Sequence, residues 1–257
     1  MISAAVILSA LTATAALATE GADYAPIYLD KTAITLDAGY MMDIDGLTVD
    51  SLTGGSISMS YVFNRTDKSA HSIGLTFGYF EGDDDGEFHY DTGIRYTEEQ
   101  FPYQITNDAT ENLSQEILPI IVTYKYHRNI TDSISCYAGA RAGVYISKSK
   151  VSRHSNNWFI MASPDMGLAN VEVWEETGTY SRTSIAPTLG LELGAEYQFA
   201  KNWSWYLGGS IDASFNVMRQ KTLQEHSDHA INTVANPETS KGTAVSATIR
   251  TGFTYQF

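Results

Sequence analysis

The sequence predicts an all-β chain of eight antiparallel strands that form an up-and-down barrel across a membrane. Apolar and polar residues alternate with a period of two in eight segments, which is the pattern of a strand with two different faces. The connections between these segments are alternately short and long, and an even strand count with this alternation is typical of membrane barrels. The polar face of the segments is mostly Ser, Gly, Thr and Ala, which makes a poor aqueous surface but a good lining for a narrow lumen. The apolar face is therefore predicted to point outward to lipid.

The last of the eight segments, 243–257, carries the most regular pattern. One face holds Thr243, Val245, Ala247, Ile249, Thr251, Phe253, Tyr255 and Phe257, and the intervening residues form a polar or small face. The segment is long enough to cross a bilayer as a tilted strand, which needs about 9–11 residues. It ends on Phe257, the last residue of the sequence.

This terminal segment resembles the last strand of bacterial outer-membrane β-barrels, in which a C-terminal Phe with aromatics at alternate positions acts as the assembly signal. Over 32–257 the pattern resembles the small eight-stranded barrels of the OmpA-transmembrane-domain and OmpX-like type. The resemblance implies a monomer in the cell outer membrane, with short periplasmic turns and long extracellular loops. It also implies contact with outer-membrane lipids and lipopolysaccharide, and recognition of the terminal strand by the barrel-assembly machinery. Phe257 is the assembly signal in this comparison.

The other seven strands are predicted at 32–44, 56–64, 71–80, 116–128, 133–147, 183–199 and 203–217. Pro119 predicts a bulge or a frayed edge near the start of the fourth strand, because proline has no backbone N–H for the ladder. Long polar segments at 81–115, 148–182 and 218–242 are predicted to be loops. Residues 158–161 and 171–174 either pair as a hairpin beyond the membrane or add two spanning strands.

The N-terminal residues predict export. Residues 1–18 contain an apolar run too short for a membrane-spanning helix, and 16–18 form a small-x-small cleavage pattern, so this segment is read as a signal peptide. It contains no Lys or Arg, which indicates an atypical signal or a start further upstream; an N-terminal anchor or buried helix is the alternative. Residues 19–31 are then a short periplasmic lead-in, and 32–257 form the barrel.

The composition limits the partners. Lys and Arg number 16 against 30 Asp and Glu, which gives a formal net charge of −14. This charge argues against nucleic acid, because neutralising phosphates needs a basic face. It fits an environment rich in divalent cations or a basic partner. Cys136 is the single cysteine, so an internal disulfide and a cysteine metal cluster are excluded.

Aromatic residues on the apolar faces gather beside the short turns. This placement predicts an aromatic belt at one membrane interface, where amphipathic rings are best accommodated. The belt residues are Tyr61, Phe63, Tyr124, Tyr126, Tyr197, Phe199, Trp203, Trp205, Phe253, Tyr255 and Phe257.

A few charges of both signs fall on the inward faces of the strands. They are Asp37, Lys125, Arg141, Glu192, Glu196, Asp212 and Arg250. Isolated charges are costly in a narrow lumen, so we expect them to pair. Adjacent strands predict the pairs Arg141–Glu192 and Arg250–Asp212. These pairs either fill the lumen as a plug, which the small size of an eight-stranded barrel favours, or form a gated ion path.

No catalytic constellation emerges from the sequence, and no cofactor or metal is predicted. Lipid A-modifying barrels need His and Ser near the outer rim, but His71-Ser72 lies at a turn on the opposite end and His154-Ser155 lacks an orienting acid. Proteases of the omptin type have ten strands. The acidic stretch 81–91 does not have the spacing of a calcium-binding loop, and Glu225, His226, Asp228 and His229 form one short tract without a further ligand.

The sequence thus predicts a non-enzymatic outer-membrane barrel with a structural or surface-interaction role. Envelope integrity, adhesion and ligand capture by acidic extracellular loops all fit this prediction. A narrow channel for ions or small solutes is the first alternative, and a lipid- or peptide-modifying barrel enzyme is another. A soluble secreted barrel is the remaining alternative, and it would require the apolar faces of the strands to point inward.

Overall fold

The computed structural model describes residues 32–64, 66, 68–91, 95–96, 102–162, 169–218 and 241–257. The predicted signal peptide and lead-in, and the segment 219–240 with its Glu225 to His229 tract, lie outside these residues. The described part of the chain has no helix that is long and apolar enough to span a membrane.

The described elements are all β-strands, and their antiparallel pairing closes into a ring. The strands are β1 (Thr32–Asp45), β2 (Ser51–Phe63), β3 (Ser69–Asp91), β4 (Arg95–Tyr96), β5 (Pro102–Asn129), β6 (Ile134–Ala162), β7 (Ala169–Ala200), β8 (Trp203–Met218) and β9 (Lys241–Gln256). The ring runs β1-β2-β3-β5-β6-β7-β8-β9 and returns to β1. The two-residue β4 pairs with β5 alone and is not part of the ring. The prediction of an all-β antiparallel barrel is confirmed.

Closure of the ring joins the two ends of the barrel sequence. β1 and β9 pair over nearly their whole lengths, from Ala33↔Gln256 to Asp45↔Val245. At the end of this seam the Phe257 N–H donates to the Thr32 carbonyl, at 3.1 Å. The pairing removes the open sheet edge that lipid does not tolerate.

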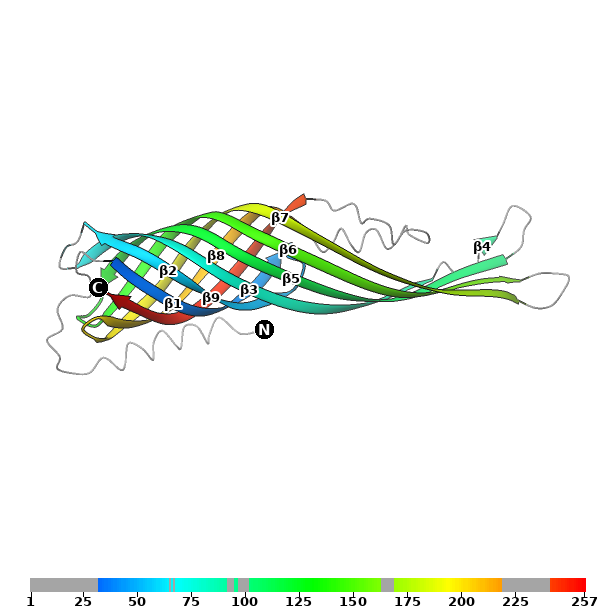
Figure 1. Ribbon diagram of the computed structural model, residues 1–257, viewed down its shortest axis with the longest axis horizontal. Coiled ribbons are helices and arrows are strands. Elements are labelled where there is room, and N and C mark those ends of the chain that lie inside the picture. Colours follow the sequence, from blue (N-terminus) through cyan, green and yellow to red (C-terminus); the bar gives the residue numbers. More distant parts are fainter. Residues whose placement is uncertain are drawn as a thin grey trace.

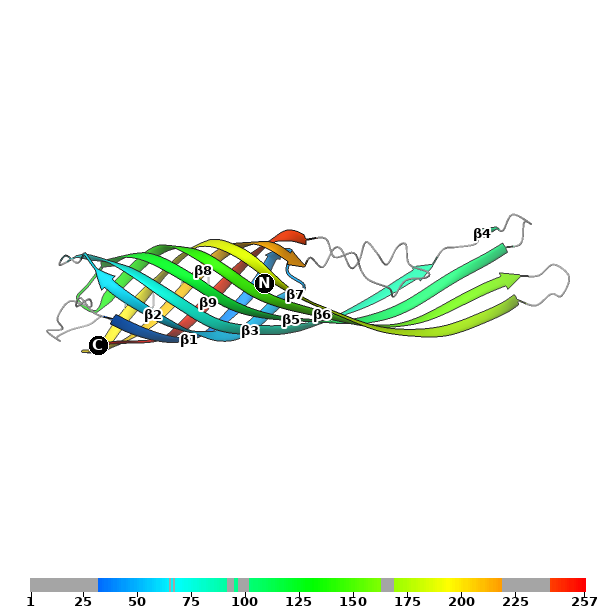
Figure 2. The ribbon, with the colours of Figure 1, turned by 45° about the horizontal axis from the view of Figure 1, so that its top comes forward.

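The molecule has two parts, a barrel and a long arm (Figure 1). β3, β5, β6 and β7 run through the barrel wall and continue far beyond it as a twisted four-stranded sheet (Figures 1 and 2). At about 3.3 Å per residue, the 28 residues of β5 reach about 90 Å, whereas about 9–11 residues cross a bilayer. Most of each long strand therefore lies outside the membrane.

The arm corrects the prediction of long loops at 81–115 and 148–182. In the structure these segments are mostly continuations of the barrel strands. The segments 158–161 and 171–174 face each other in the β6–β7 ladder, with 158–161 level with 170–173, as the predicted hairpin alternative requires. The alternation persists in the arm, but its outward face mixes acidic, hydroxyl and basic residues such as Asp85, Thr179 and Lys150. Its inward face mixes residues such as Ala109, Glu111 and Leu113. An apolar–polar template does not detect such strands, because neither face is uniformly apolar.

The connections at the other end of the barrel follow the prediction. Short turns at 64–68, 130–133 and 201–202 join β2 to β3, β5 to β6, and β7 to β8. Around Pro119 the β3–β5 register omits two pairs, between Phe77↔Ile120 and Phe80↔Ile117, as the predicted irregularity requires. The predicted loop between the first two strands is wrong in extent, since β2 already begins at Ser51 and 46–50 alone connects it to β1.

The two faces of the barrel wall have opposite character. Large apolar side chains are exposed around the outside, and Leu191 on β7 is 70% exposed. The inward face carries buried Ser, Thr, Asp, Glu and Arg side chains together with an apolar cluster near the arm. A soluble barrel has the reverse arrangement, because a continuous exposed apolar band is unfavourable in water. The chain is thus a membrane-spanning barrel, and barrels of this construction belong to outer membranes.

Candidate functional site

The mouth of the barrel on the arm side is closed by the chain itself. Residues 46–50 fold inward, and Leu47, Thr48 and Val49 are at most 1% exposed. Leu47 and Val49 belong to one buried apolar cluster with residues of every strand of the ring. The other members are Met41, Leu52, Phe80, Leu113, Ile117, Ile121, Tyr145, Val151, Ala186, Val217 and Ala244. We call residues 46–50 the mouth loop.

Hydrogen bonds fix the mouth loop in the lumen. The Asp43 N–H donates to the Asp50 carbonyl at 2.8 Å, which closes the loop at its base. Gly46 adopts a φ of 100°, a left-handed conformation that glycine adopts at little cost. Inside the barrel the Thr48 N–H donates to Gln115 Oε1 at 3.0 Å, and the Thr48 hydroxyl lies 2.9 Å from the Ser149 hydroxyl. These buried polar contacts tie the loop to both β5 and β6.

The Asp43 side chain supports the turn of the mouth loop from below. Its Oδ1 accepts the Leu47 N–H at 3.0 Å. Asp43 itself is held opposite Ser246 of β9, at the last pair before the register of the β1–β9 ladder shifts. The carboxyl is thus a structural part of the closed mouth, anchored in the barrel wall.

Below the mouth loop, Arg141 and Asp212 form a buried ion pair. Arg141 Nη1 and Asp212 Oδ2 are 3.2 Å apart, and the two residues are 5% and 0% exposed. The same carboxylate oxygen accepts the Tyr145 hydroxyl at 2.8 Å and the Ser210 hydroxyl at 3.3 Å. Arg141 also donates to the Ser210 hydroxyl. A charge pair with these extra hydrogen bonds fills this level of the lumen.

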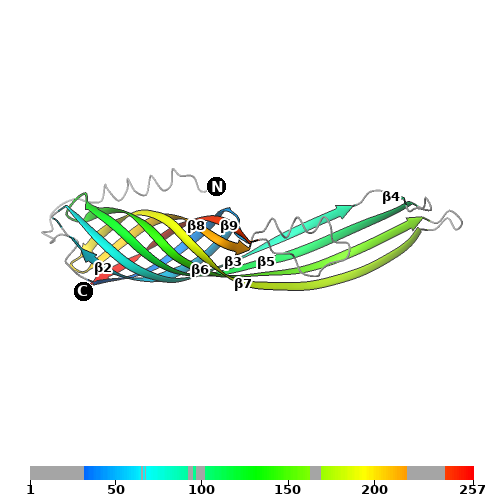
Figure 3. The same ribbon diagram turned by 90° about the horizontal axis from the view of Figure 1, so that it is seen from above.

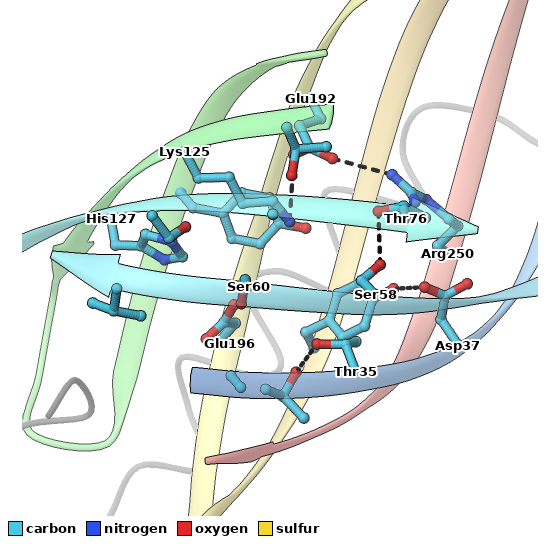
Figure 4. A pocket seen from close by; sticks show the side chains of 18 of the residues that line it. Thr35, Asp37, Ser58, Ser60, Thr76, Lys125, His127, Glu192, Glu196 and Arg250 are labelled. Carbon is cyan, nitrogen blue, oxygen red and sulfur yellow. Dashed lines mark hydrogen bonds and ion pairs between the residues drawn. The ribbon is translucent and has the colours of Figure 1, made fainter. Parts of the chain in front are cut away.

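A second charge cluster is centred on Glu192, two residues along β7 from Gly190, which is level with both Arg141 and Asp212 (Figure 4). The Glu192 carboxylate lies between two cations, with Oε1 3.3 Å from Lys125 Nζ and Oε2 3.1 Å from Arg250 Nη2. Lys125 Nζ also sits 4.4 Å from the centre of the Tyr137 ring, within reach of a cation–π contact. Glu192 thus connects β5, β7 and β9 through the interior.

The predicted lumen charges all face inward, but the predicted pairs are wrong. Arg141 was expected with Glu192 and Arg250 with Asp212, whereas the structure exchanges the two acids. Register is the reason. Arg141 is level with Gly190 on β7, and Arg250 is level with Gly208 on β8. Because glycine has no side chain, each arginine reaches over its neighbour to the carboxylate on the following strand.

Gly190 is required for this crossing. A Cβ at Gly190 would overlap Asp212 Oδ1, the oxygen beside the one that pairs with Arg141. At Gly209, on the outer face of the barrel, an added Cβ would lie 3.6 Å from the nearest atom, the Thr248 carbonyl oxygen, which is an ordinary contact. Comparing alanine substitutions at these two positions therefore separates disruption of the ion pair from the general effect of replacing a glycine in a strand.

We expect Gly190→Ala to lower the free energy of unfolding by about 1–3 kcal/mol, since the added methyl displaces the Asp212 carboxylate. The matched variant Gly209→Ala should change it by about 0.5 kcal/mol or less. Urea unfolding in lipid vesicles, followed by tryptophan fluorescence, measures both. Equal effects of the two substitutions would contradict the role given to Gly190.

Asp37 and Glu196 complete the set of inward charges. Asp37 accepts the Tyr206 hydroxyl at 2.6 Å and the Ser56 hydroxyl at 2.7 and 2.8 Å. Glu196 is 9% exposed and lines the same interior space as Asp37. The network thus connects β1, β2 and β8 as well.

A cavity of about 50 Å³ lies among these groups, between the charge cluster and the short-turn end. Its lining includes Asp37, Lys125, Glu192, Glu196 and Arg250 (Figure 4). A water molecule needs roughly 10–15 Å³ of such space and two to four polar partners, so the cavity has room for a few waters. It is too small for a sugar, peptide or lipid.

Ser72 and His127 form a serine–histidine pair on the cavity wall. Ser72 Oγ and His127 Nε2 are 2.8 Å apart, and both residues are buried. His71, of the His71-Ser72 pair rejected above as a catalytic pair, lies outside the barrel, with Nδ1 2.6 Å from the Tyr124 hydroxyl. A nucleophile and a base are thus adjacent, but the cavity that they face admits only molecules the size of water.

The structure places the predicted belt residues on the outer face, next to the short turns. Several rings touch one another: Trp203 and Tyr255 have centroids 4.9 Å apart, and Tyr255 and Phe257 5.0 Å apart. Phe199 and Phe253 meet edge to face at 6.2 Å. Contact of these rings with a membrane interface, and the assembly role of Phe257, stay predictions.

The acidic stretch 81–91 lies in the arm as part of β3. Asp83 and Asp85 are exposed on its outward face, while the His89 side chain lies outside the described residues. Within the described ranges, no group of three or more His, Cys, Asp or Glu side chains is arranged to hold a metal ion.

Sequence reasoning missed two parts of the interior. Tyr137, Tyr145 and Tyr206 stand on the small-residue faces of β6 and β8, and three large rings there are a readable sign that the lumen is filled. The sequence of the mouth loop gives a weaker sign, since its two apolar residues, Leu47 and Val49, stand in a segment of only five residues, 46–50. Its inward turn depends on contacts with residues far away in the sequence.

Comparisons with known proteins give structural likenesses of low identity. No protein-family model matches the chain, and no curated protein matches it. Neisserial surface protein A is 13% identical, with 88% of this chain and 97% of that chain covered and a TM-score of 0.40. Ail, the attachment invasion locus protein of Yersinia pestis, is 13% identical over the same shares, with a TM-score of 0.37.

The outer membrane protein OprG from Pseudomonas aeruginosa is 14% identical to this chain. The match covers 89% of this chain and 96% of that chain, with a TM-score of 0.38. Because these TM-scores are below 0.5, the membrane assignment rests on the exposed apolar surface of the barrel itself.

Proposed function

We propose that this protein is a closed outer-membrane barrel of eight spanning strands that displays its arm outside the cell for interaction with another molecule. The observation that carries the proposal is the division of the chain. The lumen is filled by the mouth loop and two charge clusters, whereas four strands continue past the barrel as an exposed sheet. The structure thus provides an exposed sheet for contact with other molecules, and in its described part it provides no open passage through the lumen.

The orientation of the arm follows from the short turns. In bacterial outer-membrane barrels short turns face the periplasm and the longer connections face the exterior. By this rule the turns at 64–68, 130–133 and 201–202 are periplasmic and the arm is extracellular. Its neighbours are outer-membrane lipids and lipopolysaccharide, and the β9 strand with Phe257 contacts the barrel-assembly machinery during insertion.

A narrow channel is the second candidate, and the polar cavity favours it. Asp37, Lys125 and Arg250 line this cavity inside the lumen and provide charges that an ion can contact. The mouth loop opposes this role, because Leu47 and Val49 place a buried apolar layer across the path. Ions cross such a layer only if the loop leaves the lumen. We propose no enzymatic role, since Ser72 and His127 face a space too small for a substrate.

Labelling of intact bacteria tests the display of the arm. In a Cys136→Ser background, Asp85→Cys places a thiol on the exposed face of the arm, and Asp132→Cys places one in an exposed short turn. A membrane-impermeant maleimide should label the arm variant on intact cells and the turn variant only after permeabilisation. Labelling of the turn variant alone on intact cells would reverse the proposed orientation.

A further inference from the structure

One edge of the arm is formed by β3. Pairing between β2 and β3 ends at Thr53↔Glu81, whereas β3 continues along β5 as far as Asp91↔Thr106. The start of β2 still lies beside Gly82, where an added Cβ would meet the Ser51 carbonyl oxygen, and the Asp50 N–H donates to Asp84 Oδ2 at 3.4 Å. Among the residues that the structure describes, no strand pairs with the other side of 84–91. Figure 3 shows β3 and β7 as the two outer strands of the arm. An edge of this kind presents a row of backbone N–H and C=O groups that can pair with an added strand.

The side chains along this edge carry charge of one sign. Glu81, Asp83, Asp85 and Glu87 alternate along β3, and all four are exposed on the same outward face. The neighbouring outward column on β5 consists of Glu116, Ser114, Asn112 and Thr110. No described cation on the adjacent strand therefore faces the acids at Asp83, Asp85 and Glu87. We call Glu81, Asp83, Asp85 and Glu87 the acidic column.

The acidic column decides which strand can be added. A second copy that paired edge to edge through β3 would place acids opposite acids, which is destabilising. The other edge of the arm, on β7, offers Glu175, Thr177, Thr179, Ser181 and Thr183 on its outward face. That column contains an acid and four hydroxyls but no cation, so it does not complement the acidic column either. A strand with Lys or Arg at every second position complements it along its length.

We propose that the 84–91 edge of β3 binds an extended, basic segment of another protein by strand addition. Backbone hydrogen bonds to the edge hold the segment, and its alternate Lys or Arg side chains face the acidic column. The inference rests on the proposed function, because it requires the arm to be accessible from outside. The net charge of −14 attracts such a partner over a distance, and the column sets its register.

A synthetic peptide tests the pairing with the full-length protein refolded in a non-ionic detergent. The probe is a fluorescein-labelled dodecapeptide of alternating Lys and Thr, and fluorescence anisotropy reports its binding. We expect it to bind at least about tenfold more tightly than a peptide of the same composition with its lysines in one block. Affinity should fall as NaCl is raised from about 0.05 to about 0.5 M, since these exposed charges are screened.

Two protein variants locate the site. Asp85→Asn/Glu87→Gln should weaken binding of the alternating peptide about tenfold or more. The matched variant Asp132→Asn/Glu175→Gln removes the same number of exposed negative charges elsewhere and should leave the affinity unchanged. Equal weakening by both variants would show that only the overall charge attracts the peptide.

Backbone methylation separates strand addition from charge attraction. One peptide is N-methylated at every Lys and a second at every Thr, so each keeps its charges but loses the N–H groups of one edge. One of the two should lose binding. If both bind as well as the parent peptide, or if the block peptide binds equally, strand addition is wrong. Such a result leaves the labelling of Asp85→Cys on intact cells unaffected, so the display function is judged separately.

Discussion

Asp212→Ala is expected to lower the free energy of unfolding by about 3–5 kcal/mol, because it leaves Arg141 charged and buried without its partner. The Asp212 carboxylate is fully buried and also accepts the hydroxyls of Tyr145 and Ser210. The substitution thus removes the acceptor of three groups at one level of the lumen. Urea titration in lipid vesicles, with the fluorescence of Trp203 and Trp205 as the signal, measures the change.

Two further variants show whether the loss comes from the buried ion pair. Asp132→Ala, at an exposed turn, should change the free energy of unfolding by about 0.5 kcal/mol or less. The double variant Arg141→Met/Asp212→Leu replaces the pair by apolar side chains and should recover much of the loss, as replacement of buried ion pairs often does. A small effect of Asp212→Ala would mean that water reaches Arg141 and the lumen is not filled at this level.

Leu47→Ala should lower the free energy of unfolding by about 2–5 kcal/mol, since it leaves a cavity in the apolar cluster at the mouth. Leu47 is 1% exposed and comes from the shortest connection on the arm side, yet it lies among residues of the surrounding wall. The same urea titration gives the value.

Ile130→Ala is the matched control for the mouth loop. Ile130 is an apolar residue in a short turn at the opposite end of the barrel and is 61% exposed. Its truncation should cost about 0.5 kcal/mol or less. If Leu47→Ala costs no more than Ile130→Ala, the mouth loop does not pack inside the barrel.

The sequence was sufficient for the barrel because its wall has one apolar and one small polar face. The alternation that ends in Phe253, Tyr255 and Phe257 places each residue on a face without any knowledge of its neighbours. The same alternation put all seven lumen charges inside, and the short turns set the strand order. These features are local, and local patterns are readable from one chain.

Register could not be read in the same way. The partner of Arg141 depends on which residue of β7 stands level with it, and a shift of two residues exchanges Gly190 for Glu192. Neither alternative changes the face of any side chain, so the hydrophobic pattern does not discriminate between them. The ion pairs were therefore predicted between the correct residues but in the wrong combination.

The arm escaped prediction for a different reason. Its strands have water on their outward face, where Asp83, Asp85 and Thr179 stand, and polar residues such as Glu111 on the inward face. Loops have a similar, largely polar composition, so composition does not distinguish these strands from loops. Pairing between strands, and not burial of an apolar face, keeps these segments extended, and pairing joins residues too far apart in sequence to show a pattern.

Single-channel recording of the purified, refolded protein in planar bilayers tests the closed barrel most directly. The mouth loop, the Arg141–Asp212 pair and the Glu192 cluster together leave space for only a few waters, so we expect bilayers that contain the protein to show no steady ion current. Asp212→Ala provides a comparison in which one filled level is weakened. Large, stable and uniform conductance steps from the unmodified protein would contradict a filled lumen and make the chain a channel.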